Sequence, residues 1–248
     1  MNEQQSKDEL ERYQASLMTV KNETIIGKDY SKMKTPQFTS IGSKFINCRF
    51  DSMRVDCAAF ASGATLSCYI DCSFDGIRIK RVLGGIARFE RCSFKNVAIT
   101  GWSLEACDLV DCVFTGQLKA GRYGGSFWGT PTPYWQKEYK KTQNEFRGND
   151  FSGCSLVNMD FRMGVDLRLQ VLPQGPNYLY IEDGAHAVEH ALESIKNWED
   201  EKLRNIAKIC LELLLDKIMK GQEQIFISNM SGYLAPIWPQ LCEVLTGK

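Results

Sequence analysis

Four short stretches of the sequence, at residues 48–50, 72–74, 92–94 and 112–114, read Cys-Arg-Phe, Cys-Ser-Phe, Cys-Ser-Phe and Cys-Val-Phe. The last three begin 20 residues apart, and the first begins 24 residues before the second. A small residue, a variable residue and a large apolar residue form an alternation in which the first and third side chains point the same way. Because this alternation returns at a nearly fixed interval, it predicts a solenoid rather than a globular core.

The same phrase also recurs every five residues within each 20-residue unit, which defines four columns. We expect the backbone to turn a corner every five residues, since such a side is too short for an ordinary strand. Inward residues of successive turns should then stack about 4.8 Å apart, over roughly five turns. The Cys-x-Phe copies form the first column. The second holds Met53-x-Val55, Ile77-x-Ile79, Val97-x-Ile99 and Cys154-x-Leu156, the third Ala58-x-Phe60, Trp102-x-Leu104 and Met159-x-Phe161, and the fourth Ser67-x-Tyr69, Ala87-x-Phe89, Cys107-x-Leu109 and Asn144-x-Phe146.

Over about residues 43–166, this pattern resembles the pentapeptide-repeat family. The resemblance implies a mainly β fold, a right-handed quadrilateral β-helix, with a large residue in the central slot of each phrase. The slot two positions earlier is small in the family, and Cys fills it here at positions 48, 72, 92, 107, 112 and 154. The sequence departs from the family at Gly84, which breaks one column, and at Met53, Ile77 and Trp102, which are larger than the usual occupant.

The composition favours a cytoplasmic protein. The chain has 248 residues, of which 30 are basic and 30 acidic, so the zero formal net charge gives no support to a general nucleic-acid binder. Six of the ten cysteines lie in solenoid slots, where Cys acts as a small hydrophobic residue. No signal peptide opens the chain, and no apolar run reaches membrane-spanning length. We therefore expect reduced cysteines and no membrane contact.

The regions that flank the repeat are predicted to cap it. Residues 1–42 should form a helix to about residue 20, introduced by the capping box Ser6-Lys7-Asp8-Glu9, and then an irregular lead-in. The solenoid is expected over residues 43–170. Residues 171–248 should form a linker and a helical cap, because the apolar period becomes helical from Ala185. We expect a short extended piece at 224–227 and a final helix at 236–245.

An inserted loop at about residues 117–143 interrupts the solenoid, because Phe114 and Phe151 are 37 residues apart instead of 20. The loop is rich in aromatic and basic residues, which are common in binding hot spots. We expect it to contact a partner; the alternative is that its aromatic side chains pack on the solenoid. The candidate contact residues are Arg122, Tyr123, Phe127, Trp128, Tyr134 and Trp135.

A second candidate surface comes from the outward positions of the second column. Arg54, Arg78, Lys80 and Arg81 should lie on neighbouring turns as a basic stripe. The alternative is an ordinary solvated surface.

One motif suggests a metal site. His186-Ala187-Val188-Glu189-His190 fits the H-x-x-E-H pattern, in which two histidines on one helix face bind zinc and Glu189 would act as general base. The alternative is two surface histidines, and we expect no metal, no cofactor and no catalytic residue here, because only 58 residues follow His190 to supply a third ligand.

Three hypotheses for the function follow. The favoured one is a non-catalytic scaffold that binds a protein partner, and the family resemblance implies a bacterial protection or immunity-type factor that shields or inhibits its target. The second is a DNA mimic that binds a topoisomerase, but such relatives are acidic, whereas residues 41–118 hold 9 basic and 8 acidic residues. The third is a zinc-binding protein or metallopeptidase. The sequence leaves the partner and the oligomeric state open.

Overall fold

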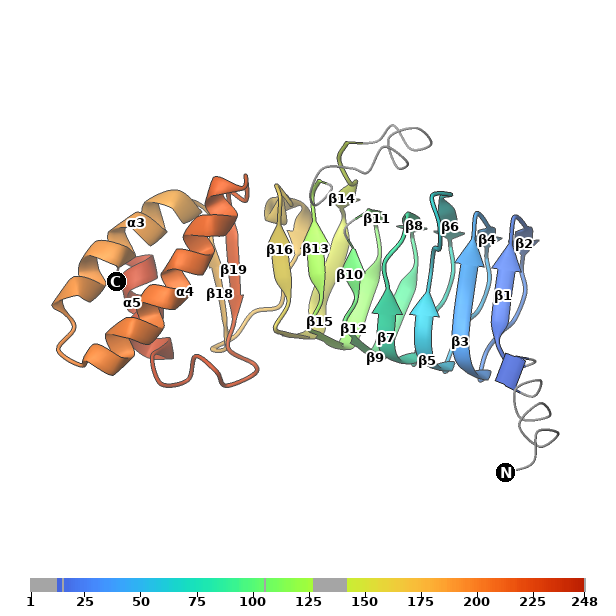
Figure 1. Ribbon diagram of the computed structural model, residues 1–248, viewed down its shortest axis with the longest axis horizontal. Helices are drawn as coiled ribbons and strands as arrows, with labels where there is room; N and C mark the ends of the chain where they lie inside the picture. The colour runs from blue at the N-terminus through green and yellow to red at the C-terminus, as the bar shows by residue number, and fades with distance from the viewer. Residues whose placement is uncertain (1–12, 15, 105, 127–141, 248) are drawn as a thin grey trace, which may run out of the picture.

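The computed structural model describes residues 13–14, 16–104, 106–126 and 142–247. These residues form a β-solenoid of about seven turns, which ends in a unit with three α-helices (Figure 1). The predicted fold class is therefore confirmed. The rod is longer than the predicted five turns because its first strand begins at Met18.

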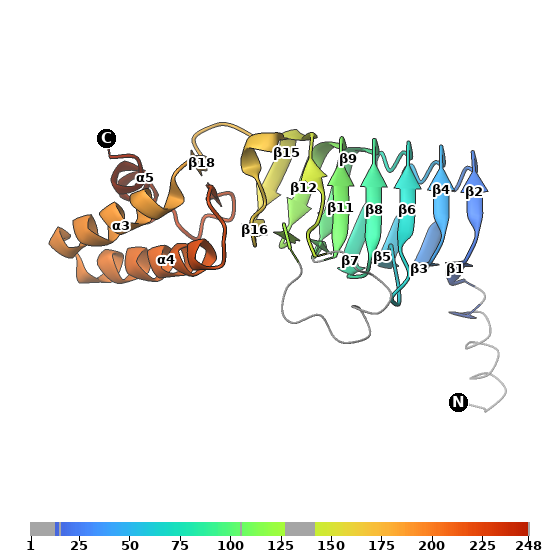
Figure 2. The same ribbon diagram turned by 90° about the horizontal axis from the view of Figure 1, so that it is seen from above.

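Within the described residues, the strands of the rod form three sheets, each made of parallel strands, and Figure 2 shows the strands of successive turns side by side along the rod. Each turn has four sides, and side 1 to side 4 correspond to the first to fourth columns of the sequence pattern. The longer strands of sheet A continue around a corner from one side to the next. Sheet A contains β1 (Met18–Lys21), β3 (Lys34–Ile41), β5 (Arg54–Ala59), β7 (Arg78–Leu83), β9 (Ser93–Thr100), β12 (Val113–Lys119), β15 (Asn149–Val157) and β17 (Gln170–Val171). Sheet B contains β2 (Thr24–Ile26), β4 (Lys44–Ile46), β6 (Ser67–Ile70), β8 (Ala87–Glu90), β11 (Cys107–Val110) and β14 (Phe146–Arg147). Sheet C contains β10 (Ser103–Leu104), β13 (Arg122–Gly124) and β16 (Asp160–Arg162).

The prediction of a helix to residue 20 and an irregular lead-in was wrong for residues 18–42. β1 pairs in parallel with β3, and β2 pairs with β4, so these residues build the first turn and part of the second. The repeat is hidden here because polar residues occupy positions that are apolar in the next turn. Lys28 takes the place of Cys48 and is exposed, and Thr35 takes the place of Val55 and is buried. The rings of Tyr30 and Phe50 stack with their centroids 5.1 Å apart. The Lys28 ammonium lies 5.0 Å from the centroid of the Tyr30 ring, which is a cation–π contact near the end of the rod.

Left-handed backbone makes the corners. Asn47, Ser52, Asp71 and Gly76 have φ angles of 52°, 56°, 54° and 71°, and the same conformation recurs five residues apart further along the rod. Such φ values are uncommon outside glycine, and Asn and Asp adopt them more readily than most residues. This explains how a side of only five residues can end in a sharp turn.

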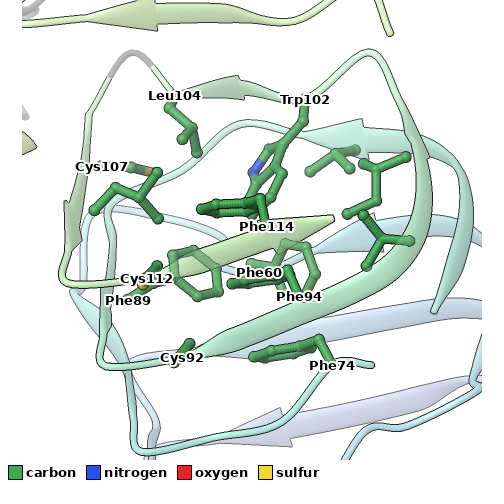
Figure 3. Close-up of a cluster of buried hydrophobic side chains, with 14 of the residues drawn as sticks. Phe60, Phe74, Phe89, Cys92, Phe94, Trp102, Leu104, Cys107, Cys112 and Phe114 are labelled. Atoms are coloured by element: carbon green, nitrogen blue, oxygen red, sulfur yellow. The ribbon is translucent and has the colours of Figure 1, made fainter. Parts of the chain in front are cut away.

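The phenylalanines of side 1 form one continuous stack through the rod. The rings of Phe50, Phe74, Phe94, Phe114 and Phe151 follow one another with centroid distances of 4.7–4.8 Å. Figure 3 shows part of this stack beside Cys92 and Cys112. The spacing equals the distance between neighbouring strands, so ring stacking and strand pairing stabilise the same arrangement.

On side 3, two large side chains meet across the turn that contains Gly84. The rings of Phe60 and Trp102 lie two turns apart in the chain, yet their centroids are only 5.7 Å apart (Figure 3). Both also pack edge-on against Phe89, at 5.3 and 5.5 Å. Trp102 is larger than the usual occupant of its slot, and its ring reaches far enough toward the turn before it to contact Phe60.

All ten cysteines are free thiols, and Cys48, Cys72, Cys92 and Cys112 lie buried in one column on side 1. The predicted Cys column is confirmed. Asn149 takes the next position in this column: it accepts a hydrogen bond from the Cys112 N–H at 3.1 Å and donates one to the side chain of Gln170 at 2.9 Å. A short polar ladder thus ends the apolar column.

The predicted insertion at 117–143 begins too early. Gln117, Leu118 and Lys119 belong to β12, which pairs with β9 and β15, and β13 pairs with β10 and β16. The turn is therefore complete to Gly124, and an antiparallel bridge joins Ser126 to Gln143. The insertion lies between these two residues.

The C-terminal unit combines helices with a small antiparallel sheet, which lies between the rod and the helices (Figure 1). The extended piece at 224–227 and the final helix are confirmed, but the predicted linker contains a strand. The elements are β18 (Tyr178–Ile181), α3 (Gly184–Ser194), η2 (Ile195–Asn197), α4 (Glu201–Met219), β19 (Ile225–Ser228) and α5 (Trp238–Thr246), after η1 (Leu167–Leu169) at the end of the rod. None of the helices in the described part of the chain is both long and apolar enough to span a membrane.

Candidate protein-binding surface

Side 2 of the rod presents basic side chains on three neighbouring strands. Lys34 of β3 lies opposite Arg54 of β5, and Arg54 lies opposite Arg78 of β7. The next residues, such as Val55 and Ile79, point into the core, so strand alternation turns the three basic side chains outward, and all three are exposed. Because neighbouring strands lie about 4.8 Å apart, the row spans roughly 10 Å.

Lys80 and Arg81 extend this row along β7. Lys80 forms an ion pair with Asp56, with 2.7 Å between its ammonium nitrogen and the carboxylate oxygen. Arg81 lies opposite Cys57 of β5 and is exposed. Lys34, Arg54, Arg78, Lys80 and Arg81 are called the basic patch below.

The structure brings together the four basic residues that the second column predicted. Lys34 was missed because residues 21–42 were assigned to an irregular lead-in. The signal that could have found it is its position 20 residues before Arg54, the period of the repeat.

Like charges are adjacent within the basic patch. Arg54 lies between Lys34 and Arg78 in register, and such pairs are unfavourable in a sheet. Among the described residues, neither Arg54 nor Arg81 forms an ion pair. The Arg78 guanidinium donates hydrogen bonds to the carbonyls of Gly76, Ile77 and Asn96, which fix its position without neutralising its charge.

The arginines of sheet B have acidic partners instead. The Arg88 guanidinium lies 2.9 Å from a Glu90 oxygen, 3.2 Å from an Asp108 oxygen and 2.6 Å from a Glu145 oxygen. Hydrogen bonds from Arg88 lower the pKa values of Glu90 and Glu145. Arg147 likewise contacts Glu145, at 2.8 Å. Arg88 and Arg147 of this sheet are therefore paired within the fold, whereas Arg54 and Arg81 of the basic patch are exposed without an ion pair among the described residues.

Tyr123 is not part of a binding surface, contrary to the prediction. It is fully buried and lies between Leu104 and Phe161 on side 3. Burial raises the pKa of its hydroxyl well above the usual value, and that hydroxyl has no hydrogen-bond partner among the described residues. The signal for its burial was present in the sequence, because Gly121-x-Tyr123 repeats the small-x-large phrase.

Of the other contact residues predicted in the loop, the structure describes only Arg122. Arg122 is exposed on side 3, opposite Ser103 and Asp160 and away from the basic patch. Phe127, Trp128, Tyr134 and Trp135 lie outside the described residues.

The two histidines lie on α3 and are exposed. A ring nitrogen of His190 is 3.3 Å from the Val244 carbonyl oxygen of α5. In the described part of the chain, no three His, Cys, Asp or Glu side chains are grouped so that they could hold a metal ion. The sequence motif is therefore not completed by a third ligand from these residues.

Protein-family models and curated proteins offer no match to this chain.

Proposed function

We propose that the protein is a non-catalytic scaffold that holds a protein partner on the basic patch. The observation that carries this proposal is the contrast between the two sheets: Arg54 lies between two other cations, while Arg88 has three carboxylates around it. Adjacent like charges destabilise a sheet, so the three cations are better explained by a role in binding than by a role in stability. Binding an acidic partner would supply the missing countercharges.

The rod is suited to this role because its interior is filled. Stacked rings occupy the core from Phe50 to Phe151, so the solenoid offers rigid outer faces for large partners. A rigid surface loses little conformational entropy when it binds. The scaffold is proposed to be a pentapeptide-repeat protein of the bacterial protection or immunity type, which shields or inhibits its target.

The alternatives have weaker support. A DNA mimic needs a continuous acidic face, but carboxylates of sheet B such as Glu90 and Glu145 are paired with Arg88. A zinc enzyme needs a third ligand beside His186 and His190. We therefore propose the binding scaffold alone.

The test is affinity capture from the source cells with the full-length chain as bait. The Arg54→Glu/Arg78→Glu variant reverses two charges of the patch, and Lys44→Glu, an exposed lysine on sheet B, is the matched control. We expect one protein to be retained by the wild type and the control and lost with the double variant, then to bind directly when purified. Equal retention by all three baits, or no specific protein at all, would contradict the proposal.

A further inference from the structure

The distance between neighbouring cations of the basic patch indicates which kind of acidic partner can pair with all of them. Its row of Lys34, Arg54 and Arg78 runs across the strands, along the axis of the rod, with one cation on each turn. Two strand spacings separate the first from the last, which is about 9.6 Å. A partner that pairs with all three cations must present three acidic groups over that length.

An acidic α-helix meets this requirement. Residues i, i+3 and i+7 lie on one face of a helix and span about 10.5 Å, at a rise of about 1.5 Å per residue. In an extended peptide, the same-face residues i, i+2 and i+4 span about 13 Å, which matches the row less closely. The spacing therefore favours a helix that lies along the rod axis.

The surroundings of the row argue against a nucleic acid. Asp51 and Asp75 lie at the corner beside the row. The Asp75 carboxylate accepts hydrogen bonds from the Ser93 hydroxyl at 2.6 Å and from the Lys95 N–H at 2.8 Å. Asp56 lies within the patch itself, paired with Lys80. Along the rod axis the position after Arg78 is Ala98 of β9, which carries no charge, and on both sides of the row these carboxylates lie on the same turns as the cations. A wide polyanion would therefore meet carboxylates beside the row, whereas a single acidic stripe can follow the three cations alone.

We infer that the partner of the basic patch is an acidic protein helix with carboxylates at i, i+3 and i+7, which docks parallel to the rod axis against Lys34, Arg54 and Arg78. This inference rests on the proposed function and narrows it. Carboxylates at this spacing would each contact one cation, with Arg54 at the centre of the contact.

The experiment measures the fluorescence anisotropy of labelled probes with the full-length protein at low salt. One probe is an alanine-rich helical peptide of about 16–20 residues with glutamates at i, i+3 and i+7. The second has the same composition with its glutamates spread around the helix, and the third is a short DNA duplex. We expect the first probe to bind at least about tenfold more tightly than the other two, and Arg54→Glu to weaken it by about tenfold or more.

The control variant is Lys44→Glu, which should leave the affinity for the first peptide unchanged. Arg54→Gln removes the central charge without reversing it and should give an intermediate loss. Equal binding of the two peptides would overturn the helix geometry, and tighter binding of the duplex would identify a nucleic-acid surface. No measurable binding of the first peptide, or binding that Arg54→Glu leaves unchanged, would also overturn the inference. The capture experiment remains a separate test, since a captured partner without an acidic helix would keep the proposed function and reject only this inference.

Discussion

Phe94 lies in the middle of the ring stack of side 1, between Phe74 and Phe114, and is fully buried. Its neighbour Lys95 is exposed, because successive residues of a strand point to opposite sides. These two residues therefore test the inward and outward assignment on which the repeat depends.

We expect Phe94→Ala to lower the free energy of unfolding by about 3–5 kcal/mol, the usual range when a buried phenylalanine site is emptied. Lys95→Ala should change it by less than about 0.5 kcal/mol. Urea unfolding of both variants measures the difference. Equal losses at the two positions would contradict the assignment.

The two fully buried tyrosines of the rod differ in one respect. The Tyr69 hydroxyl donates a hydrogen bond to the Phe60 carbonyl at 2.8 Å, whereas the Tyr123 hydroxyl has no hydrogen-bond partner among the described residues. A buried polar group without a partner is unfavourable, so removing it should not weaken the fold.

We expect Tyr69→Phe to destabilise the protein by about 1 kcal/mol, and Tyr123→Phe to be neutral or stabilising. Thermal or urea unfolding of the pair gives the comparison directly. A loss of similar size in Tyr123→Phe would mean that its hydroxyl has a partner in solution.

At the scale of elements, the C-terminal unit completes the last turn of the rod through glutamine side chains. Gln222 is buried; its side-chain oxygen accepts a hydrogen bond from the Val165 N–H at 3.1 Å, and its amide donates one to the Val165 carbonyl at 2.9 Å. The side chain thereby replaces the strand that a further turn would have supplied. Gln224 does the same for the Leu167 N–H, at 3.1 Å.

We expect Gln222→Ala to destabilise the protein by about 1–3 kcal/mol, because it leaves buried backbone groups of Val165 unpaired. The control is Lys220→Ala in the same unit, where an exposed ammonium pairs with Asp216 at 2.7 Å, and it should change stability by about 1 kcal/mol or less. Hydrogen exchange should also become faster at the Val165 amide in the first variant alone. Unchanged exchange there would indicate that the cap does not hold this strand edge.

At the scale of the whole molecule, the buried cysteines make stability depend on pH. Burial raises the pKa of Cys154 to about 12, and that of Cys92 is raised by burial and by its contact with Cys112. The pKa of Cys72 is raised by its hydrogen bond with Cys92 and by burial. These thiols stay protonated in the folded rod when those of the unfolded chain, with pKa values of about 8.5, already ionise.

The folded state therefore holds more protons than the unfolded state above about pH 8.5, and its stability should fall as pH rises. Each such thiol contributes a loss of up to about 1.4 kcal/mol per pH unit in that range, and no loss below it. Urea unfolding under reducing conditions between pH 7 and pH 10 measures the slope. Cys92→Ala should make the slope shallower, and a slope that is unchanged would contradict the assignment of buried thiols.

Much of the rod could be predicted from the sequence, because a solenoid repeats one local environment. Cys92-x-Phe94 specifies the same two inward slots in every turn, so a short pattern determines the ring stack, the columns and the outward position of Arg54 and Arg78. The prediction failed where the environment changes. In the first turn the slot at Lys28 is exposed and holds a charged residue, and the period at Tyr123 is obscured by the insertion that follows it.

The sequence by itself determined the solenoid, its inward and outward alternation, and the helical character of the C-terminal unit, because these depend on contacts within one turn or between turns at a fixed interval. Only the tertiary structure decided how Gln222 closes the last turn, how Phe60 and Trp102 meet across a turn, and that Arg88 is paired with carboxylates while Arg54 is not. These features depend on which residues of separate turns become neighbours. A change of one residue in a corner or an insertion alters that register, and no local pattern records it.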